Sequence, residues 1–156
     1  MFAGFEGVWS LGVAGSRSLF GCGRWHGPDG WLDEVSRSMR HLACRTLPAV
    51  VLLGDASGVD ACADIVTRTW FPDAARSIFG VVPGYGPAAR TRAMVAALAA
   101  CPEPVLLACP WNTSSPGTWL AVRCAVAAEV PVVLSPAPGA RPYLYSSPPL
   151  SRSLFA

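Results

Sequence analysis

Lysine is absent from this chain, and all twelve basic residues are arginine. The absence excludes any mechanism that needs a lysine nucleophile, a lysine Schiff base or the phosphate-binding lysine of a Walker loop. Charged residues of either sign are also scarce, at 14% of the 156 residues, and the formal net charge is only +2. Because non-specific binding to nucleic acid needs many basic side chains on phosphates, we do not expect nucleic acid as a partner.

Paired metal-ligand motifs are missing as well. The six cysteines include no CxxC pair, and each of the two histidines lies near only one cysteine, so the spacing of a zinc site is not present. We expect neither a metal nor a cofactor. Cys62, Cys101 and Cys124 fall within expected helices among Ala and Val, which favours buried free thiols over disulfides.

The sequence contains no segment suited to cross a bilayer. Its longest uncharged run, 104–122, includes Pro110 and Pro116 and is expected to break as a loop. Glu6 stands where a signal peptide carries positive charge. We therefore expect a cytoplasmic protein with no membrane partner.

Hydrophobic residues are abundant, at 52%, which excludes disorder of the whole chain. The length fits one domain. Apolar runs that suit buried strands alternate with segments of helical periodicity, separated by Gly and Pro. The expected strands are 8–14, 49–53, 76–82, 104–109 and 131–134, and the expected helices are 29–42, 59–70, 88–101 and 118–128.

This alternation predicts an α/β three-layer sandwich with a five-stranded, mainly parallel sheet. Ligands in such folds bind beyond the carboxyl ends of the strands, where the strand order reverses. The helices that follow the strands begin at the same edge, and their N-termini supply N–H donors and a positive dipole. The edge is therefore a natural phosphate site.

Three turns follow expected strands at this edge. They are Gly15-Ser16-Arg17, the segment GDASGVD at 54–60, and SSPGT at 114–118. A single Gly-rich turn is more often structural than ligand-binding, but three in succession on one edge predict a binding cleft.

Arg90 lies in the first turn of the third expected helix. A cation there is unfavourable for the helix dipole, which predicts an anion for it to meet; a solvated surface arginine is the alternative. Arg92 is about 200° further around the helix, so we expect only Arg90 to reach the cleft. Trp111 and Tyr85 either stack on a ligand or plug the edge of the core.

Four segments of the chain carry more information through their order and spacing than any one of them does alone. They are VAGSR, GDASGVDACA, GPAARTRAM, and VLLACPWNTSSPGT followed by AEVPVV. Together they resemble the SLOG superfamily, the Rossmann-like group that includes the Lonely Guy phosphoribohydrolases and the DprA-like proteins. The closest likeness is to its small YspA-type branch. The resemblance covers about 8–134 and implies a Rossmann-like fold.

The resemblance also implies a ligand site, since the Gly-rich turns of the superfamily bind the phosphates and sugar of a nucleotide or a related ligand. Carried over by position, the ligand-binding residues are Gly15, Ser16, Arg17, Gly54, Asp55, Gly58, Arg90, Ser115, Gly117 and Thr118.

The chain departs from the hydrolases of the superfamily at two points. Their PGG-x-GT-x-x-E motif supplies a Glu for glycosidic cleavage, and Ala121 stands at that position here. Their Arg-Lys pair reads Arg90-Thr91, and Thr91 also replaces the Asn of the YspA-type branch. The only candidates for a catalytic role are then Asp55, Asp60 and Arg90.

These features favour a sensor or signalling module that binds a nucleotide or a nucleotide-derived ligand, and we lean against an enzyme. One alternative is a phosphoribohydrolase that cleaves the N-glycosidic bond of a nucleoside monophosphate. Another is a self-assembling structural protein, and we expect a homo-oligomer.

The C-terminal segment differs in composition from the rest. We divide the chain into a domain at 1–135 and a Pro/Ser-rich arm at 136–156, which also carries large apolar side chains such as Tyr143, Leu150 and Phe155. The arm is either a disordered tail or a segment that packs on its own domain or on a neighbouring copy.

Overall fold

A computed structural model of the chain describes residues 5–17, 28–80, 86–111 and 115–145. Within them, four helices alternate with the first five strands, and a short sixth strand follows. The elements are β1 (Ser10–Gly15), α1 (Pro28–Leu42), β2 (Val50–Gly54), α2 (Val59–Trp70), β3 (Ala75–Phe79), α3 (Pro87–Ala99), β4 (Pro104–Cys109), α4 (Pro116–Ala127), β5 (Val132–Leu134) and β6 (Tyr143–Leu144).

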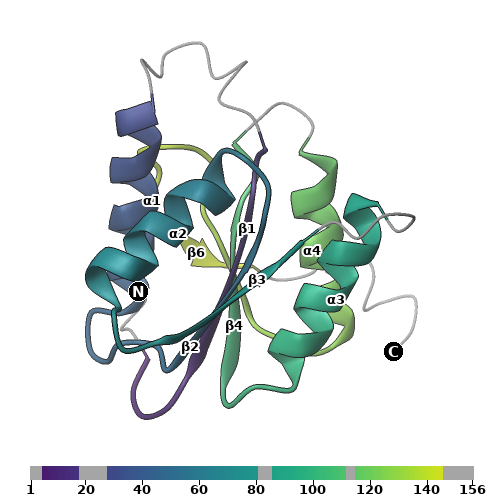
Figure 1. Ribbon diagram of the computed structural model, residues 1–156, viewed down its shortest axis with the longest axis horizontal. Coiled ribbons are helices and arrows are strands. Elements are labelled where there is room, and N and C mark those ends of the chain that lie inside the picture. The colour runs from purple at the N-terminus through teal and green to yellow at the C-terminus, as the bar shows by residue number, and fades with distance from the viewer. Residues whose placement is uncertain (1–4, 18–27, 81–85, 112–114, 146–156) are drawn as a thin grey trace.

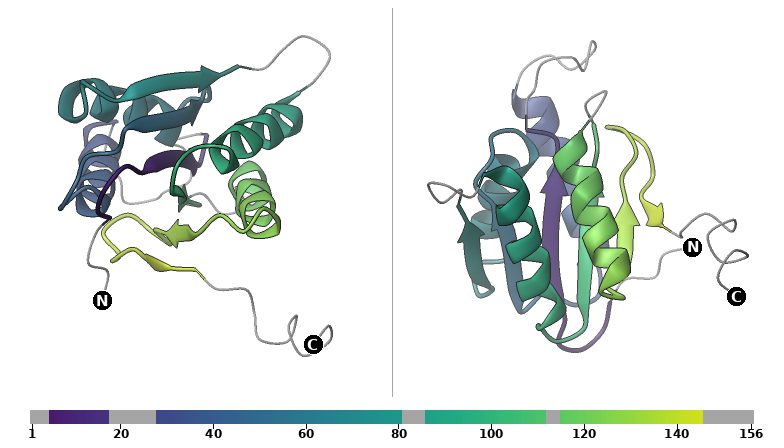
Figure 2. Two further views of the ribbon diagram at one scale, coloured as in Figure 1. Left: turned by 90° about the horizontal axis from the view of Figure 1, so that it is seen from below. Right: turned by 90° about the vertical axis from the view of Figure 1, so that its right-hand side faces the viewer.

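The strands form one sheet in the order β3-β2-β1-β4-β5-β6. All pairs are parallel except β5 with β6. Figure 1 looks along the sheet from the β3 edge, with α1 and α2 on one face and α3 and α4 on the other. Figure 2 shows α3 and α4 side by side across the strands. The α/β class, the three layers and the mainly parallel sheet are as expected.

The expected strand count of five was one too low. The additional strand, β6, pairs antiparallel with β5 through Val133 opposite Leu144. It has only two residues, and both are exposed. Such a short segment has neither the alternation nor the apolar run by which strands are recognised in a sequence.

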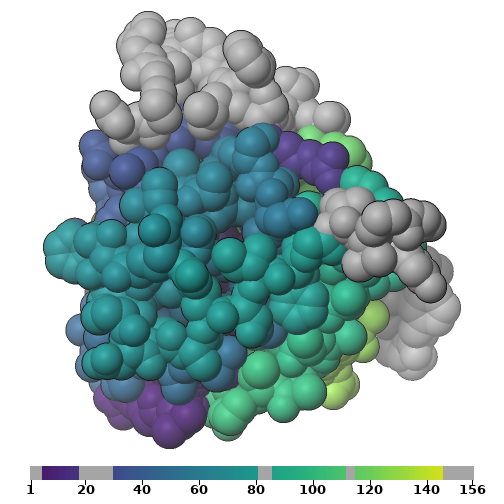
Figure 3. Space-filling model, in the orientation of Figure 1, coloured from purple at the N-terminus to yellow at the C-terminus, as the bar shows by residue number. Residues whose placement is uncertain are grey.

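The third strand also differs from its expected range of 76–82, since β3 covers Ala75–Phe79. It lies at the edge of the sheet, and its side chains are largely exposed, so polar residues such as Arg76 and Ser77 are tolerated there. In the space-filling view, the face toward the viewer is formed mainly by β3 and the helices beside it (Figure 3).

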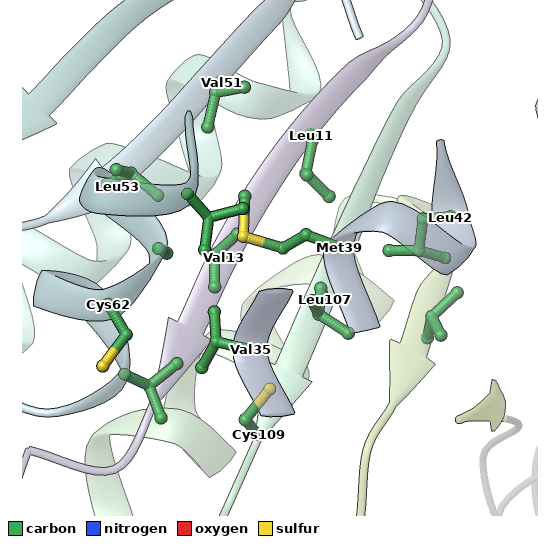
Figure 4. Packing of buried hydrophobic residues seen from close by; sticks show 14 of the residues in the cluster. Leu11, Val13, Val35, Met39, Leu42, Val51, Leu53, Cys62, Leu107 and Cys109 are labelled. Carbon is green, nitrogen blue, oxygen red and sulfur yellow. The ribbon is translucent and has the colours of Figure 1, made fainter. Parts of the chain in front are cut away.

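Side chains from β1 point alternately into two cores, one on each face of the sheet. Leu11 and Val13 pack with Val35 and Met39 of α1 on one face, as Figure 4 shows. On the other face, a Cβ on Gly12 would lie 2.5 Å from Leu98 Cδ2, so the missing side chain lets α3 approach the strand closely. The sheet is thus buried on both faces, as parallel sheets are.

The expectation of buried thiols is met in part. Cys62 is buried and forms no disulfide, and burial raises the pKa of its thiol. Cys101 and Cys124 also form no disulfide but are only half-buried. Cys101 follows the end of α3 and Cys124 lies on α4, and both pack against the core while staying partly exposed, so Ala and Val neighbours in the sequence do not by themselves indicate full burial.

The described part of the C-terminal arm packs on its own domain. The Gly139 N–H donates to Glu34 Oε2 at 2.9 Å, and the Tyr145 ring lies 6.3 Å from that of Trp119. The remainder of the arm, 146–156, lies outside the described residues, and the boundary at 135/136 stays a prediction. In the described part of the chain, no helix combines the length and apolar character needed to cross a membrane.

Candidate functional site

The three Gly-rich turns meet at the carboxyl ends of β1, β2 and β4. The Ser16 N–H donates to the carbonyl oxygen of Cys109 at 3.1 Å, and the Val59 N–H donates to the carbonyl oxygen of Ser16 at 3.0 Å. The hydroxyls of Ser16 and Ser115 are 2.6 Å apart. In Figure 3 the end of β1 (purple) and the start of α4 (green) meet near the top of the molecule. The strand order reverses between β1 and β4, so the turns surround the position where such sheets bind ligands.

Two glycines allow this close approach. Gly58 has φ +80°, and a Cβ there would lie 2.3 Å from the carbonyl oxygen of Ser16. A Cβ on Gly15 would lie 2.4 Å from the side chain of Val59. Larger residues at either position would separate the first turn from the second.

A cavity of about 700 Å³ opens at this edge, between the N-terminal halves of α3 and α4. That volume is within the range of small-molecule sites. The sequence-predicted residues that line it are Gly15, Ser16, Arg17, Gly54, Asp60, Arg90, Ser115, Gly117 and Thr118. Asp55 and Gly58 are not among the lining residues; Asp55 contacts Arg90, and Gly58 packs against the backbone of Ser16 and Arg17.

Asp60 places a buried carboxyl group in the wall of the cavity, in the first turn of α2. Only 5% of the residue is exposed, and its Oδ2 accepts a hydrogen bond of 3.3 Å from the Ala56 N–H. Burial raises the pKa of Asp60 from 3.8 to about 6, although the nearby Arg90 charge opposes this rise. A carboxyl group with such a pKa exchanges its proton near neutral pH, which is the property that acid–base chemistry requires.

Arg90 is buried rather than solvated, since its side chain is 8% exposed. It donates from Nη1 to Asp55 Oδ1 at 2.6 Å. Arg90 was expected to meet an anion, and the anion that it meets in the structure is a carboxylate of the chain itself, Asp55. This ion pair fixes the guanidinium at the wall of the cavity, where it also faces Asp60.

The start of α4 has free hydrogen-bonding capacity. Ser115 is the N-cap residue with φ 39°, but its side chain does not cap the helix, and Pro116 follows it. Thr118, in the first turn, is 3% exposed, and its Oγ1 is buried with no hydrogen-bond partner among the described residues. A helix N-terminus that its N-cap side chain leaves uncapped, together with a buried hydroxyl that has no partner among the described residues, is suited to bind an anion at the wall of a cavity.

Sequence reasoning missed two arginines of this cavity. Arg92 and Arg123 both line it, together with apolar residues such as Met94 and Leu120. Excluding Arg92 from the cleft was wrong, because the cavity extends over more than one side of α3 and an arginine side chain is long. The composition of α3 and α4 contained a signal for these two residues, because Arg90, Arg92 and Arg123 are the only charged residues in the two helices.

Trp111 belongs to the core and not to the cavity. It is 7% exposed, its Nε1 donates to the carbonyl oxygen of Ser135 at 3.1 Å, and its ring packs edge-on against Trp31. Tyr85, the other aromatic considered for stacking, lies outside the described residues.

Among the described residues, no group of three or more His, Cys, Asp or Glu side chains gathers where it could hold a metal ion. Comparisons with known proteins give no family for this chain: no protein-family model and no curated protein matches it.

Proposed function

We propose that this chain is a SLOG-type, Rossmann-like domain that binds a nucleotide or a nucleotide-derived ligand and acts as a sensor or signalling module. The observation that carries the proposal is the start of α4, where the N-terminus lacks a side-chain cap and the buried Thr118 hydroxyl has no partner in the described part of the chain. An oxyanion bound there accepts hydrogen bonds from the N–H groups at the start of α4 and from the Thr118 hydroxyl, because all of these groups are donors.

The electrostatics of the cavity support an anionic ligand. Arg17, Arg90, Arg92 and Arg123 line it, and Asp60 is the only carboxyl group among the described residues that line it. Since the pKa of Asp60 is raised to about 6, its negative charge is partly suppressed in weakly acidic solution. The positive charge therefore exceeds the negative charge around the space that a phosphate would enter.

The apolar part of the lining supports an organic ligand rather than inorganic phosphate alone. Val13, Met94 and Leu120 line the same cavity, and its volume of about 700 Å³ exceeds what a single phosphate needs. A nucleotide fits both the polar and the apolar parts of the lining. Its phosphate binds at the α4 N-terminus, and its base and ribose lie against these apolar side chains.

Thermal unfolding with a panel of nucleoside monophosphates and diphosphates tests the proposal. At least one nucleotide is expected to raise the melting temperature of the parent protein. Arg90→Ala is expected to weaken that binding by about 1–3 kcal/mol, the size of a lost charge-assisted contact. Arg76→Ala is the matched control, because Arg76 also pairs with a carboxylate, Asp64, but does not line the cavity. If no nucleotide stabilises the parent protein, the proposal is wrong.

Asp60 supports a second candidate, N-glycosidic hydrolysis of a nucleoside monophosphate. In that reaction, protonated Asp60 gives its proton to the base as the C1′–N bond breaks, and water adds to C1′ and returns a proton to the carboxylate. The products are the free base and ribose 5-phosphate. Release of base that is lost in Asp60→Asn but retained in Asp73→Asn, an exposed carboxylate elsewhere, would favour the enzyme over the sensor.

A further inference from the structure

The charged residues of α3 and α4 are unusually few and of one sign. Across Pro87–Ala99 and Pro116–Ala127, the only charged side chains are Arg90, Arg92 and Arg123. All three line the same cavity. Two otherwise uncharged helices therefore contribute their whole charge to one space.

The three arginines do not have equal surroundings. Arg90 is held in an ion pair with Asp55 and faces Asp60. Arg92 and Arg123 form no ion pair within residues 5–17, 28–80, 86–111 and 115–145. The carboxylates that partly compensate Arg90 thus leave two further positive charges, both on exposed side chains that line the cavity, without a carboxylate partner in the described part of the chain.

Neither of these two charges belongs to the first turn of α4. Arg123 lies five residues after Thr118 on α4, and Arg92 lies on the neighbouring helix α3. At 1.5 Å per residue, the backbone of Arg123 is about 7–8 Å further along α4 than the backbone of Thr118. One phosphate that fills the hydrogen bonds at the start of α4 therefore leaves room and charge for another anionic group.

We propose that Arg92 and Arg123 bind a second phosphate, so that the ligand of this cavity is a nucleotide with two phosphate groups and not a monophosphate. The inference rests on the proposed nucleotide site and specifies its ligand class. A second phosphate supplies the negative charge that the cavity lacks, and a guanidinium binds a phosphate through two parallel hydrogen bonds. The cavity volume of about 700 Å³ accommodates the larger ligand.

Titration calorimetry at constant ionic strength tests the inference with three probes for each of adenosine and guanosine: the 5′-monophosphate, the 5′-diphosphate and the 3′,5′-bisphosphate. We expect one of the two-phosphate forms to bind at least about tenfold more tightly than the monophosphate, the scale of one charge-assisted contact. Tighter binding of the 5′-diphosphate indicates that the site takes a pyrophosphate. Tighter binding of the 3′,5′-bisphosphate indicates that it takes phosphates on two different oxygens of the ribose.

Arg92→Ala and Arg123→Ala separate the second phosphate from the first. Each is expected to remove most of the two-phosphate advantage while changing the monophosphate Kd by less than about twofold. Arg141→Ala is the control, because Arg141 is exposed, does not line the cavity and removes the same charge. Circular dichroism of each variant confirms folding before the titration.

Three outcomes overturn the inference, and the third is distinguishable from the first two. If monophosphates bind as tightly as the two-phosphate forms, or if Arg141→Ala reduces the advantage as much as Arg92→Ala does, the second phosphate subsite is wrong and the nucleotide site stands. If no nucleotide binds at all, the proposed function fails and this inference fails with it.

Discussion

The hydroxyl of Ser16, at the end of β1, lies 2.6 Å from the hydroxyl of Ser115, 99 residues later at the start of α4. Both side chains are buried. Because the Ser115 side chain bonds to Ser16 and does not cap α4, this contact joins the first and third turns beside the cavity.

Removing the hydroxyl from either serine is expected to lower the free energy of unfolding by about 1 kcal/mol, the net value of one hydrogen bond. The double-mutant cycle of Ser16→Ala and Ser115→Ala, measured by urea unfolding, should give a coupling free energy of similar size. The exposed Ser77→Ala provides the baseline. Strictly additive effects of the two substitutions would show that the contact contributes nothing.

Asp60 makes stability depend on pH in a direction unusual for a carboxyl group. Its pKa is about 6 in the folded chain and 3.8 when unperturbed, so the folded chain holds the extra proton between these values. The free energy of unfolding therefore falls as pH rises through this window, by about 3 kcal/mol in total. Asp60→Asn, which is never charged, should match the parent protein near pH 4 and exceed its stability at pH 8.

Urea unfolding at pH 4, 6 and 8 measures this difference. Asp73→Asn, an exposed position, should leave the pH profile of the parent protein unchanged. The account of Asp60 is contradicted if Asp60→Asn is less stable than the parent protein at pH 8, because the ionised carboxylate beside Arg90 would then be a net stabilising group.

Two glycines of the site should respond in opposite ways to alanine. Gly58→Ala places a Cβ against backbone at φ +80°, so we expect a loss of about 2 kcal/mol or more in the free energy of unfolding. A Cβ on Gly117 meets nothing within 4 Å, so Gly117→Ala should keep or raise the stability of α4. Its methyl group nevertheless enters the cavity wall and should weaken nucleotide binding by about 1 kcal/mol or more. Normal binding by Gly117→Ala would place the ligand elsewhere.

The order of strands and helices could be predicted because each element carries a local signal. The run at 49–53 is wholly apolar, and a helix with its periodic apolar face follows the Gly58 turn. The meeting of the turns at one edge follows from the parallel sheet. The sixth strand could not be predicted, because its two exposed residues form a strand only through pairing with β5.

The contacts within the site were less predictable than its location. The sequence placed Asp55 and Arg90 in separate turns, and only the packing of α3 beside β2 shows that they form an ion pair. Trp70 illustrates the same limit, since this large apolar side chain at the end of α2 is 46% exposed, with the Arg40 guanidinium 3.7 Å from the centre of its ring. A position on a helix does not determine which neighbour covers it.

Thr118→Val is the most direct test of the central claim that the start of α4 binds a phosphate. The substitution keeps the shape of the side chain and removes a buried hydroxyl that has no partner in the described part of the chain. Replacing an unsatisfied buried polar group with an apolar one should raise the stability of the ligand-free protein. Titration of both proteins with the tightest-binding nucleotide should show an affinity lower by about 1 kcal/mol or more for Thr118→Val. Unchanged affinity together with raised stability would contradict the claim.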